Sequence, residues 1–484
     1  MSVIEIYLKK LFETKEITIP PNRQSLFEEF ISTDSCKTLG GAILDIQKEI
    51  MKDWQAINEI EEFFDQNINI PNATQHKPYE AKINTGLNEI GNVEFIDITG
   101  IDELGLTFNQ EEFKIEGSPT HSGDFKFNFL FKIKDKEQAT FDHKKEMTVI
   151  INPDPKTLWK DIPSNKDADF WKKDDDFFSG PLGNRNIVVS SKRGRSHKNV
   201  GSFREDDYNF KYFEQNGWSV VAVADGAGSY SLSRLGSKLA CSSVIEYFEN
   251  EQFFGSDNVF DEQLSEFDKT KDETLLRNIE VSAFKDLYLA AKFTHEQIKK
   301  HALETSIKRP ELFDNPKAKT PLDYYHSTLI FTLFKKYHFG YVVLSFGVGD
   351  CPIALMDKKE NSTTLLNWLD VGEFGGGTRF ITQPDIFHSK DHPMASRFKF
   401  TICTDFSYLF LMTDGIYDPK FVVEANLEKN EKWSEFLADL KGKNEDGIAV
   451  DFDKSNSEIA LQLSEWMDFW SPGNHDDRTL AIVF

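Results

Sequence analysis

The chain has 484 residues, which is enough for two or three domains that each bury a core. Acidic residues outnumber basic ones by 80 to 56, giving a formal charge of −24, and such a surface repels nucleic acid and anionic membranes. No apolar run approaches the roughly 20 residues of a membrane-spanning helix, and MSVIEIYLKKLFETKE lacks the pattern of a secretory signal. The four scattered cysteines suit a reducing compartment. We therefore expect a cytoplasmic protein that binds neither nucleic acid nor membrane.

Residues 1–75 are predicted to form a helical N-terminal segment. EIYLKKLFE and LGGAILDIQKEIMKDWQAINEIEEFF carry apolar residues at helical spacing, and INIPN ends the pattern. The segment holds no residue pattern with an evident chemistry, so we expect it to serve in packing or docking.

Residues 85–152 change to a two-residue period. VEFID, GLTFN, EFKIEG and DFKFNFLFKIK alternate apolar and polar residues between turn residues, as half-buried antiparallel strands do. The stretch GLTFNQEEFKIEGSPTHSGDFKFNFLF resembles the immunoglobulin-like modules of bacterial multidomain proteins, which implies a small β-sandwich. Residues 153–185, rich in Pro, Asp, Lys and Gly and without sustained periodicity, are predicted to be a linker.

From residue 186 onward, several buried strands are predicted to end at an aspartate. WSVVAVADGAGS, GYVVLSFGVGDCP and YLFLMTDGIYD each place an aspartate beside glycine after an apolar run, and in HDDRTLAIVF the aspartates precede the run. REDDYNF adds three consecutive carboxylates. A carboxylate buried at a strand end costs several kcal/mol unless it meets a cation, and oxygen ligands without a His or Cys set favour Mg²⁺ or Mn²⁺. Two such ions would hold a bridging hydroxide for in-line attack on phosphorus.

The order of these motifs resembles the metal-dependent type 2C serine/threonine protein phosphatases, and in particular their bacterial branch with Asp-Gly-Ala-Gly-Ser. The resemblance covers about residues 186–484. It implies that Asp225 bridges two metal ions and that the carbonyl of Gly226 binds one of them. Asp414 and Asp476 would complete the second ion's shell. Asp206 and Asp207 match the acidic pair that orders metal-bound water, and Asp350 and Asp418 match a weaker third cation site.

The basic stretch KRGRSHKNVG lies just upstream of the acidic cluster. Since phosphate needs a positive partner, we expect Arg195 to bind phosphate and His197 to act in the site. Two departures from the family pattern stand out. Ala227 occupies the position where many eukaryotic members have a histidine proposed to protonate the leaving alcohol, so metal-bound water or His197 would have to supply that proton. Asp206 stands where relatives have Glu or Gln.

The predicted fold class is α+β. SLSRLGSKLACSSVIEYFEN and TLLRNIEVSAFKDLYLAAKFTHEQIKKHALE have helical periodicity, and STLIFTLFKK with YVVLSFGVGD reads as a hairpin. The resemblance implies an α-β-β-α sandwich of two mostly antiparallel sheets flanked by helices over residues 186–484.

The predicted activity is hydrolysis of phosphoserine and phosphothreonine in proteins, with two Mg or Mn ions and a third at a weaker site. The expected partner is a phosphoprotein that is the substrate of a cognate Ser/Thr kinase. Two alternatives stay open: a catalytically weak or inactive phosphatase-like module that binds phosphoproteins, which Ala227 favours, and a small-molecule phosphoesterase.

Overall fold

The computed structural model describes residues 2–83, 93–133, 143–250, 259–357, 359, 362–370, 377–389 and 392–484. The chain divides into two compact units, Met1–Leu158 and Trp159–Phe484, and each is described by itself.

The first unit begins with three helices, α1 (Val3–Thr14), α2 (Gln24–Ser32) and α3 (Asp34–Asp65). Ser2 and Glu5 form a capping box at the start of α1, and the hydroxyl of Thr33 accepts from the Cys36 amide at the start of α3. The prediction of a helical N-terminal segment thus agrees with the structure as far as Asp65.

Two small sheets follow in the same unit. The four-stranded sheet has the order β1-β7-β6-β3 and the three-stranded sheet the order β2-β5-β4. Phe127, Phe129 and Phe131 of β6 pack in one core with Ile115 of β5 and with Phe63 at the end of α3. The strands are β1 (Ala73–Thr74), β2 (Tyr79–Lys82), β3 (Val93–Thr99), β4 (Leu106–Asn109), β5 (Lys114–Gly117), β6 (Gly123–Ile133) and β7 (His143–Asn152). The first strand therefore begins before the predicted boundary at residue 85, and residues 84–92 and 134–142 lie outside the described part of the chain.

The second unit contains two antiparallel sheets that face each other. One has five strands in the order β10-β11-β12-β13-β16 and the other six in the order β15-β14-β17-β18-β9-β8. Their strands are β8 (Asp175–Leu182), β9 (Arg185–Lys192), β10 (Asp207–Phe213), β11 (Trp218–Ala224), β12 (Leu329–Tyr337), β13 (Gly340–Val348), β14 (Ile353–Asp357), β15 (Ser362–Leu365), β16 (Phe398–Cys403), β17 (Tyr408–Met412) and β18 (Arg478–Val483). Val221 and Val223 of β11 pack against Leu409 and Leu411 of β17 in the core between the sheets.

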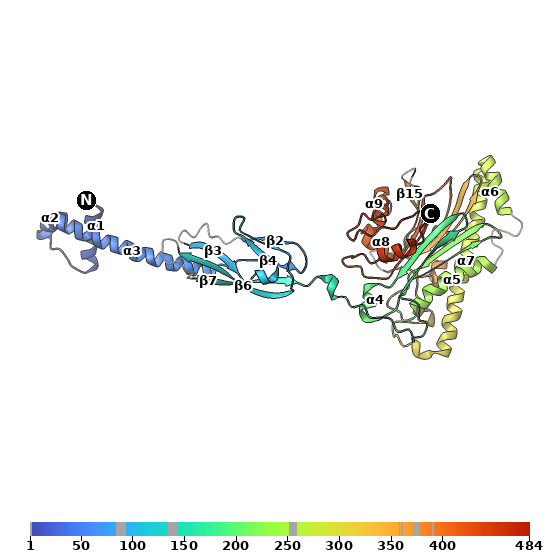
Figure 1. The fold of residues 1–484 in the computed structure, drawn as a ribbon, viewed down its shortest axis with the longest axis horizontal. Helices are drawn as coiled ribbons and strands as arrows, with labels where there is room; N and C mark the ends of the chain where they lie inside the picture. Colours follow the sequence, from blue (N-terminus) through green and yellow to red (C-terminus); the bar gives the residue numbers. More distant parts are fainter. Residues whose placement is uncertain are drawn as a thin grey trace. The chain divides into compact units, whose positions relative to one another are not determined.

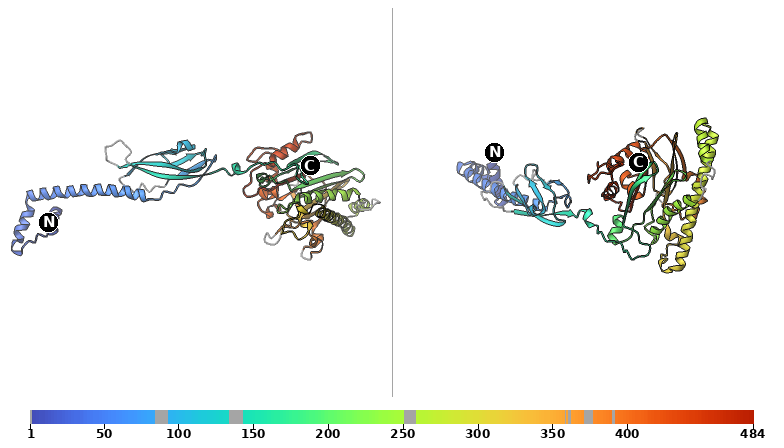
Figure 2. Two further views of the ribbon diagram at one scale, coloured as in Figure 1. Left: turned by 90° about the horizontal axis from the view of Figure 1, so that it is seen from below. Right: turned by 45° about the vertical axis from the view of Figure 1, so that its right-hand side comes forward.

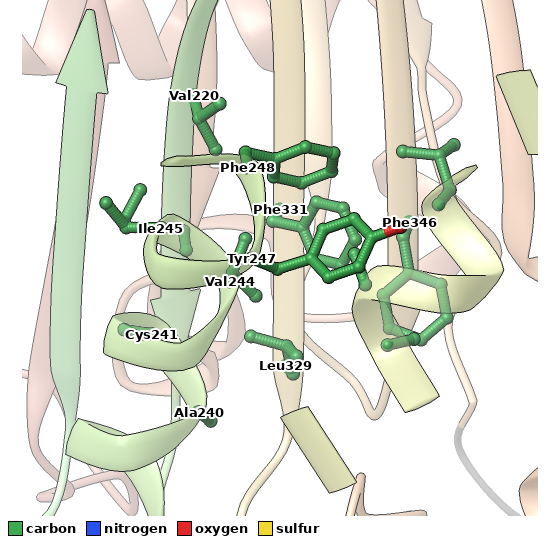
Figure 3. Close-up of a cluster of buried hydrophobic side chains, with 14 of the residues drawn as sticks. Val220, Ala240, Cys241, Val244, Ile245, Tyr247, Phe248, Leu329, Phe331 and Phe346 are labelled. Atoms are coloured by element: carbon green, nitrogen blue, oxygen red, sulfur yellow. The ribbon is translucent and has the colours of Figure 1, made fainter. Parts of the chain in front are cut away.

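Helices cover the outer faces of both sheets, so this unit is the expected α-β-β-α sandwich (Figures 1 and 2). α5 and α7 lie on the five-stranded sheet, and α8, α9 and α10 on the six-stranded one. Figure 3 shows Tyr247 and Phe248 of α5 among Phe331 and Phe346 of the sheet, with the rings of Phe248 and Phe331 centred 6.1 Å apart. The helices are α4 (Arg195–Val200), α5 (Ser233–Asn250), α6 (Val259–Thr270), α7 (Glu273–Lys308), α8 (Asp414–Phe421), α9 (Asn430–Leu440) and α10 (Ile459–Trp466).

Residues 159–185, predicted as part of the linker, belong to the second unit. β8 pairs with β9 along its whole length, from Asp175 opposite Lys192 to Leu182 opposite Arg185. Its sequence hides this role because β8 is an edge strand with a single buried residue, Leu182, so it lacks the apolar run of a core strand.

Candidate metal centre

Acidic residues from both sheets meet at one edge of the sandwich. Neighbouring strands run antiparallel, so the end of one lies beside the start of the next. Asp207 at the start of β10 is opposite Ala224 at the end of β11, and Met412 at the end of β17 is opposite Leu480 near the start of β18. This topology gathers the carboxylates that lie one or two residues from these strand ends, namely Asp206, Asp225, Asp414 and Asp476.

Asp225 lies at the centre of this group. Its amide donates to the hydroxyl of Thr328 over 2.9 Å, and its carbonyl accepts from the Thr328 amide, which fixes it beside the start of β12. A carboxylate oxygen of Asp225, one of Asp350 and the sulfur of Cys351 all lie within 4.8 Å of one another. Burial, and then the negative charges of Asp414 and Asp206, raise the pKa of Asp225 well above its usual value.

Several carboxylate oxygens near Asp225 have no hydrogen-bond donor among the described residues. Glu205 Oε2, Asp206 Oδ1, Asp350 Oδ1 and Asp414 Oδ1 are buried and accept no hydrogen bond from a described group. An unpaired buried carboxylate oxygen is costly, and a hard divalent cation is the partner that would remove the cost. The donor set is composed of oxygens and converges from several strands, so it fits Mg²⁺ or Mn²⁺.

Gly226 follows Asp225 in a position that excludes a side chain. Its backbone bridges to Ser327, and a Cβ atom there would lie 2.7 Å from the carbonyl oxygen of Glu205 and 3.0 Å from that of Ser233. The main chain of Gly226 therefore lies close against the acidic segment that precedes β10, as a backbone ligand at this centre would require.

The acidic pair at the centre is Glu205 with Asp206, one position earlier than the sequence predicted. Asp206 Oδ2 accepts from the hydroxyls of Thr413 and Thr479, each at 2.8 Å. Burial, and then the charge of Asp477, raise the pKa of Asp206 to about 7. Burial likewise raises the pKa of Glu205 to about 8, although the charge of His197 opposes this.

The structure places Asp207 elsewhere. Its Oδ2 lies 3.0 Å from the ammonium of Lys172, whose side chain is 8% exposed. Lys172 also donates to the carbonyls of Asp206, at 2.6 Å, and Glu205, at 3.3 Å. Burial alone would raise the pKa of Asp207, but the charges of Lys172 and Arg204 hold it below its usual value. Asp207 with Lys172 thus supports the acidic segment from behind, and sequence reasoning missed Lys172 because it lies in the predicted linker.

Asp476 and Asp477 have different roles. The carboxylate of Asp477 accepts from the amides of Gly194, at 2.6 Å, and Glu205, and from His197 Nδ1, at 2.9 Å. Asp476 is exposed, and its Oδ1 accepts the amide of Asp477, at 2.8 Å. Asp477 is thus occupied by hydrogen bonds within the chain, and Asp476 stays the predicted ligand.

His197 lies on α4 beside the loop that follows Asp225. A Cβ atom on Gly228 would be 3.8 Å from His197 Nε2 and 3.5 Å from Glu205 Oε2. Burial would lower the pKa of His197, but the hydrogen bond and charge of Asp477 outweigh it and raise that pKa to about 9. The structure thus places the His197 ring between Asp477 and the loop that follows Asp225.

Arg195 does not join the centre. Its guanidinium donates to the carbonyls of Phe469, at 3.0 Å, and Asp468, and lies 5.3 Å from the ring centroid of Trp470. These contacts occupy the side chain that was expected to bind phosphate, and they bind α4 to the segment before Asp476.

The two residues expected at a third cation site are both near the cluster. Asp418 lies one helical turn after Asp414 on α8, so the two share a face. The charge of Asp350 adds to burial in raising the pKa of Asp418. Asp350 is held from its other oxygen by the hydroxyl of Thr378, at 2.7 Å.

Residues 159–174, which we call the strap, pack behind the centre. The ring of Trp159 lies 4.3 Å from that of His475, next to Asp476, and the Ile162 amide donates to the Lys198 carbonyl in α4. Asp169 is paired with Arg309 at the end of α7. Together with Lys172, these contacts bring the strap against three segments that carry or support the candidate ligands.

The second unit is thus a two-sheet sandwich with carboxylates gathered at one edge. The family model "Protein phosphatase 2C" matches residues 193–451, which is more than half of the chain. The chain belongs to the protein phosphatase 2C family. None of the curated proteins compared with the chain matches it.

Solved structures of bacterial phosphatases are similar to the chain at low identity. The serine/threonine phosphatase Stp1 from Staphylococcus aureus is 14% identical with a TM-score of 0.33, and the match covers 66% of this chain and 98% of that one. The PstP/Ppp phosphatase of Mycobacterium tuberculosis is 15% identical with a TM-score of 0.32, over 61% and 97%. A PstP catalytic domain in complex with 2 manganese ions is 15% identical with a TM-score of 0.34, over 61% and 96%.

Among the described residues, no helix is both long enough and apolar enough to span a bilayer.

Proposed function

We propose that the chain hydrolyses phosphoserine and phosphothreonine in proteins with water that two Mg²⁺ or Mn²⁺ ions activate. The observation that carries this proposal is the set of buried carboxylate oxygens without hydrogen-bond donors, from both sheets, in a chain of the protein phosphatase 2C family. Asp225, the Gly226 carbonyl, Asp414 and Asp476 would hold the two ions, with Asp206 beside them. Asp350 and Asp418 would hold a third. When bound, the ions lower the pKa of water and draw charge from the phosphoryl group.

The chain's own residues supply the other parts of the reaction. Asp477 binds His197 at Nδ1, which leaves Nε2 as the ring atom that can pass a proton to a leaving alcohol. This assignment would fill the role left open by Ala227, since Nε2 lies next to Gly228, one residue further along the same loop. The pair Glu205 and Asp206 would orient water at the centre, while Lys172 holds their backbone. The substrate would be a protein phosphorylated by a cognate Ser/Thr kinase.

The test is release of phosphate from a phosphothreonine peptide with Mn²⁺, for the wild type and for Asp225→Asn. We expect Asp225→Asn to lose at least about 100-fold in kcat, as losses of central electrostatic groups do, and to bind Mn²⁺ more weakly in calorimetry. Asp446→Asn, which neutralises an exposed carboxylate outside the cluster, is the matched control and should retain both. Peptide binding without hydrolysis under any divalent metal would refute the proposal in favour of a binding module. Hydrolysis of nucleotides or sugar phosphates but not peptides would refute the substrate class.

A further inference from the structure

A pocket of about 560 Å³ lies on the second unit near the end of α7. Its volume falls within the range of roughly 300–1,000 Å³ that is usual for binding sites. The wall is mostly apolar and includes Tyr230, Leu303, Pro321, Leu322 and Pro384. Leu303 is 57% exposed, so the pocket is open to solvent. We call it the α7 pocket, and it has room for an apolar side chain of a ligand.

The α7 pocket adjoins the loop that follows the central aspartate of the candidate metal centre. The Ala227 amide donates to the His326 carbonyl over 2.9 Å. The rings of Tyr230 and His326, two residues of the lining, are centred 4.9 Å apart. Because Tyr230 is the fifth residue after Asp225, their Cα atoms are at most about 18 Å apart. An extended peptide covers that distance with about five residues.

Contacts within the chain fix the walls of the pocket. His326 Nδ1 lies 2.7 Å from the hydroxyl of Thr382, and the His326 ring stacks on that of Phe380 with 4.9 Å between their centroids. The hydroxyl of Tyr324 donates to the Asn315 carbonyl over 3.1 Å, which holds the segment that precedes β12. Since the pocket is already formed, a ligand that enters it has little ordering of the protein to offset.

Three exposed lysines give the surroundings of the pocket a positive charge. They are Lys299, Lys317 and Lys319. Lys299 lies 3.7 Å from Glu296, and both of these side chains are more than half exposed. Asp323 is the acidic residue in the described lining, and its Oδ2 already accepts from the Lys319 amide at 2.6 Å. This group of cations stands on a chain with a formal charge of −24, so it attracts carboxylates and repels basic peptides.

The apolar wall and the lysines together define the ligand. A small inorganic anion would leave the wall unused, and a purely apolar ligand would gain nothing from the lysines. A peptide that carries an apolar side chain next to carboxylates uses both. We propose that the α7 pocket binds such an acidic–apolar segment of the protein substrate, within about five residues of its phosphorylated serine or threonine. Such docking depends on the phosphatase activity proposed above and adds to it a choice among phosphoproteins.

The test compares kcat/KM of the full chain with Mn²⁺ for two kinds of phosphothreonine peptide. One carries Leu-Glu-Glu at successive positions on either side of the phosphothreonine, and the other carries alanine there. We expect a preference of about 10-fold or more for Leu-Glu-Glu at the best position. Lys317→Gln/Lys319→Gln and, separately, Leu303→Gln should reduce this preference to about twofold or less, because each removes one half of the recognition.

α7 offers a matched control for each variant. Lys292→Gln/Lys300→Gln removes the same charge from two exposed positions outside the pocket. Leu289→Gln replaces the same kind of side chain, 37% exposed, at another position outside it. Glutamine forms helices well, so circular dichroism should show an unchanged fold. Both controls should keep the preference of the wild type.

p-Nitrophenyl phosphate reports on the metal centre alone, because it is too small to reach the pocket as well. If it is hydrolysed but the peptides are not distinguished, the docking site is refuted and the proposed activity stands. A preference that survives the pocket variants, or that falls equally in the controls, refutes the docking site too. If no substrate is hydrolysed, the proposed activity fails, and fluorescence anisotropy with an unphosphorylated Leu-Glu-Glu peptide then decides on the pocket. Equal affinity of the wild type and Lys317→Gln/Lys319→Gln for that peptide would overturn the docking site.

Discussion

Replacing Lys172 by methionine tests whether the buried lysine supports the acidic segment. Lys172 is 8% exposed and donates to the Asp206 carbonyl at 2.6 Å, the Arg234 carbonyl at 3.2 Å and the Asp207 carboxylate at 3.0 Å. Methionine keeps the apolar stem but removes every donor and leaves a carboxylate buried without its cation. Loss of one partner of a buried ion pair costs about 3–5 kcal/mol, so the melting temperature of the second unit should fall by roughly 5–15 °C.

The adjacent residue provides the control. Lys173 is paired with Asp176 at 3.5 Å, but the two side chains are 71% and 36% exposed, and exposed pairs contribute about 0–1 kcal/mol. Lys173→Met should therefore leave the melting temperature within roughly 3 °C of the wild type. Adding Asp207→Asn to Lys172→Met should restore part of the lost stability, because the unpaired charge is then gone.

The stability difference between the wild type and Lys172→Met should depend on pH, and the direction of this dependence can be worked out. Asp207 has a folded-state pKa below its usual value because Lys172 and Arg204 outweigh the effect of burial, so its contribution to stability is present above the unfolded pKa of about 3.9 and is lost as the pH falls through the folded pKa. Without Lys172 the folded pKa rises, and the deficit of Lys172→Met should shrink as the pH is lowered from 7 toward 4. Thermal unfolding of both proteins, followed by fluorescence between pH 4 and 7, measures this stability deficit. A deficit no larger than that of Lys173→Met, or one independent of pH, would refute this account of Lys172.

The remaining predictions concern the metal centre directly. His197→Gln should lower kcat for a phosphothreonine peptide by about 10²–10⁴-fold and leave p-nitrophenyl phosphate, whose leaving group needs no proton, nearly unchanged; equal losses on both substrates would exclude a proton donor at Nε2. Mn²⁺ at 100 times its dissociation constant should stabilise the second unit by about 2.7 kcal/mol, since it relieves the repulsion among Asp225, Asp414 and Asp206. Differential scanning fluorimetry should show this shift in the wild type and little of it in Asp225→Asn.

The strands that end at the centre were predictable from sequence because both of their faces are buried. β11 and β17 are fully buried and mostly apolar, and the aspartate one or two residues after each of them, Asp225 or Asp414, had to lie at the sheet edge. Residues before a strand were harder to assign. Three consecutive carboxylates precede or begin β10, neighbouring side chains point to opposite sides, and no local signal distinguishes Asp206, which faces the centre, from Asp207, which faces Lys172.

The other features that the sequence did not predict depend on contacts between residues far apart in the chain. The role of Arg195 depends on carbonyls at Asp468 and Phe469, which lie far along the chain and carry no pattern that connects them with α4. Lys172 was hidden for a similar reason, because a single lysine in a polar stretch resembles a solvated residue until the fold brings it under Glu205 and Asp206.

The strap also bears on how such a chain can be assembled by recombination of genes. The match to the family model begins at Arg193, whereas the strap begins at Trp159, where the second unit begins. A crossover near residue 193 would join a new N-terminal partner to a phosphatase 2C segment that lacks Lys172 and Asp169. A crossover near residue 158 would transfer the second unit with its strap intact. The N-terminal module can thus be exchanged without loss of the strap, whereas the contacts of Lys172 and Asp169 are kept only where the strap and the rest of the second unit are inherited together.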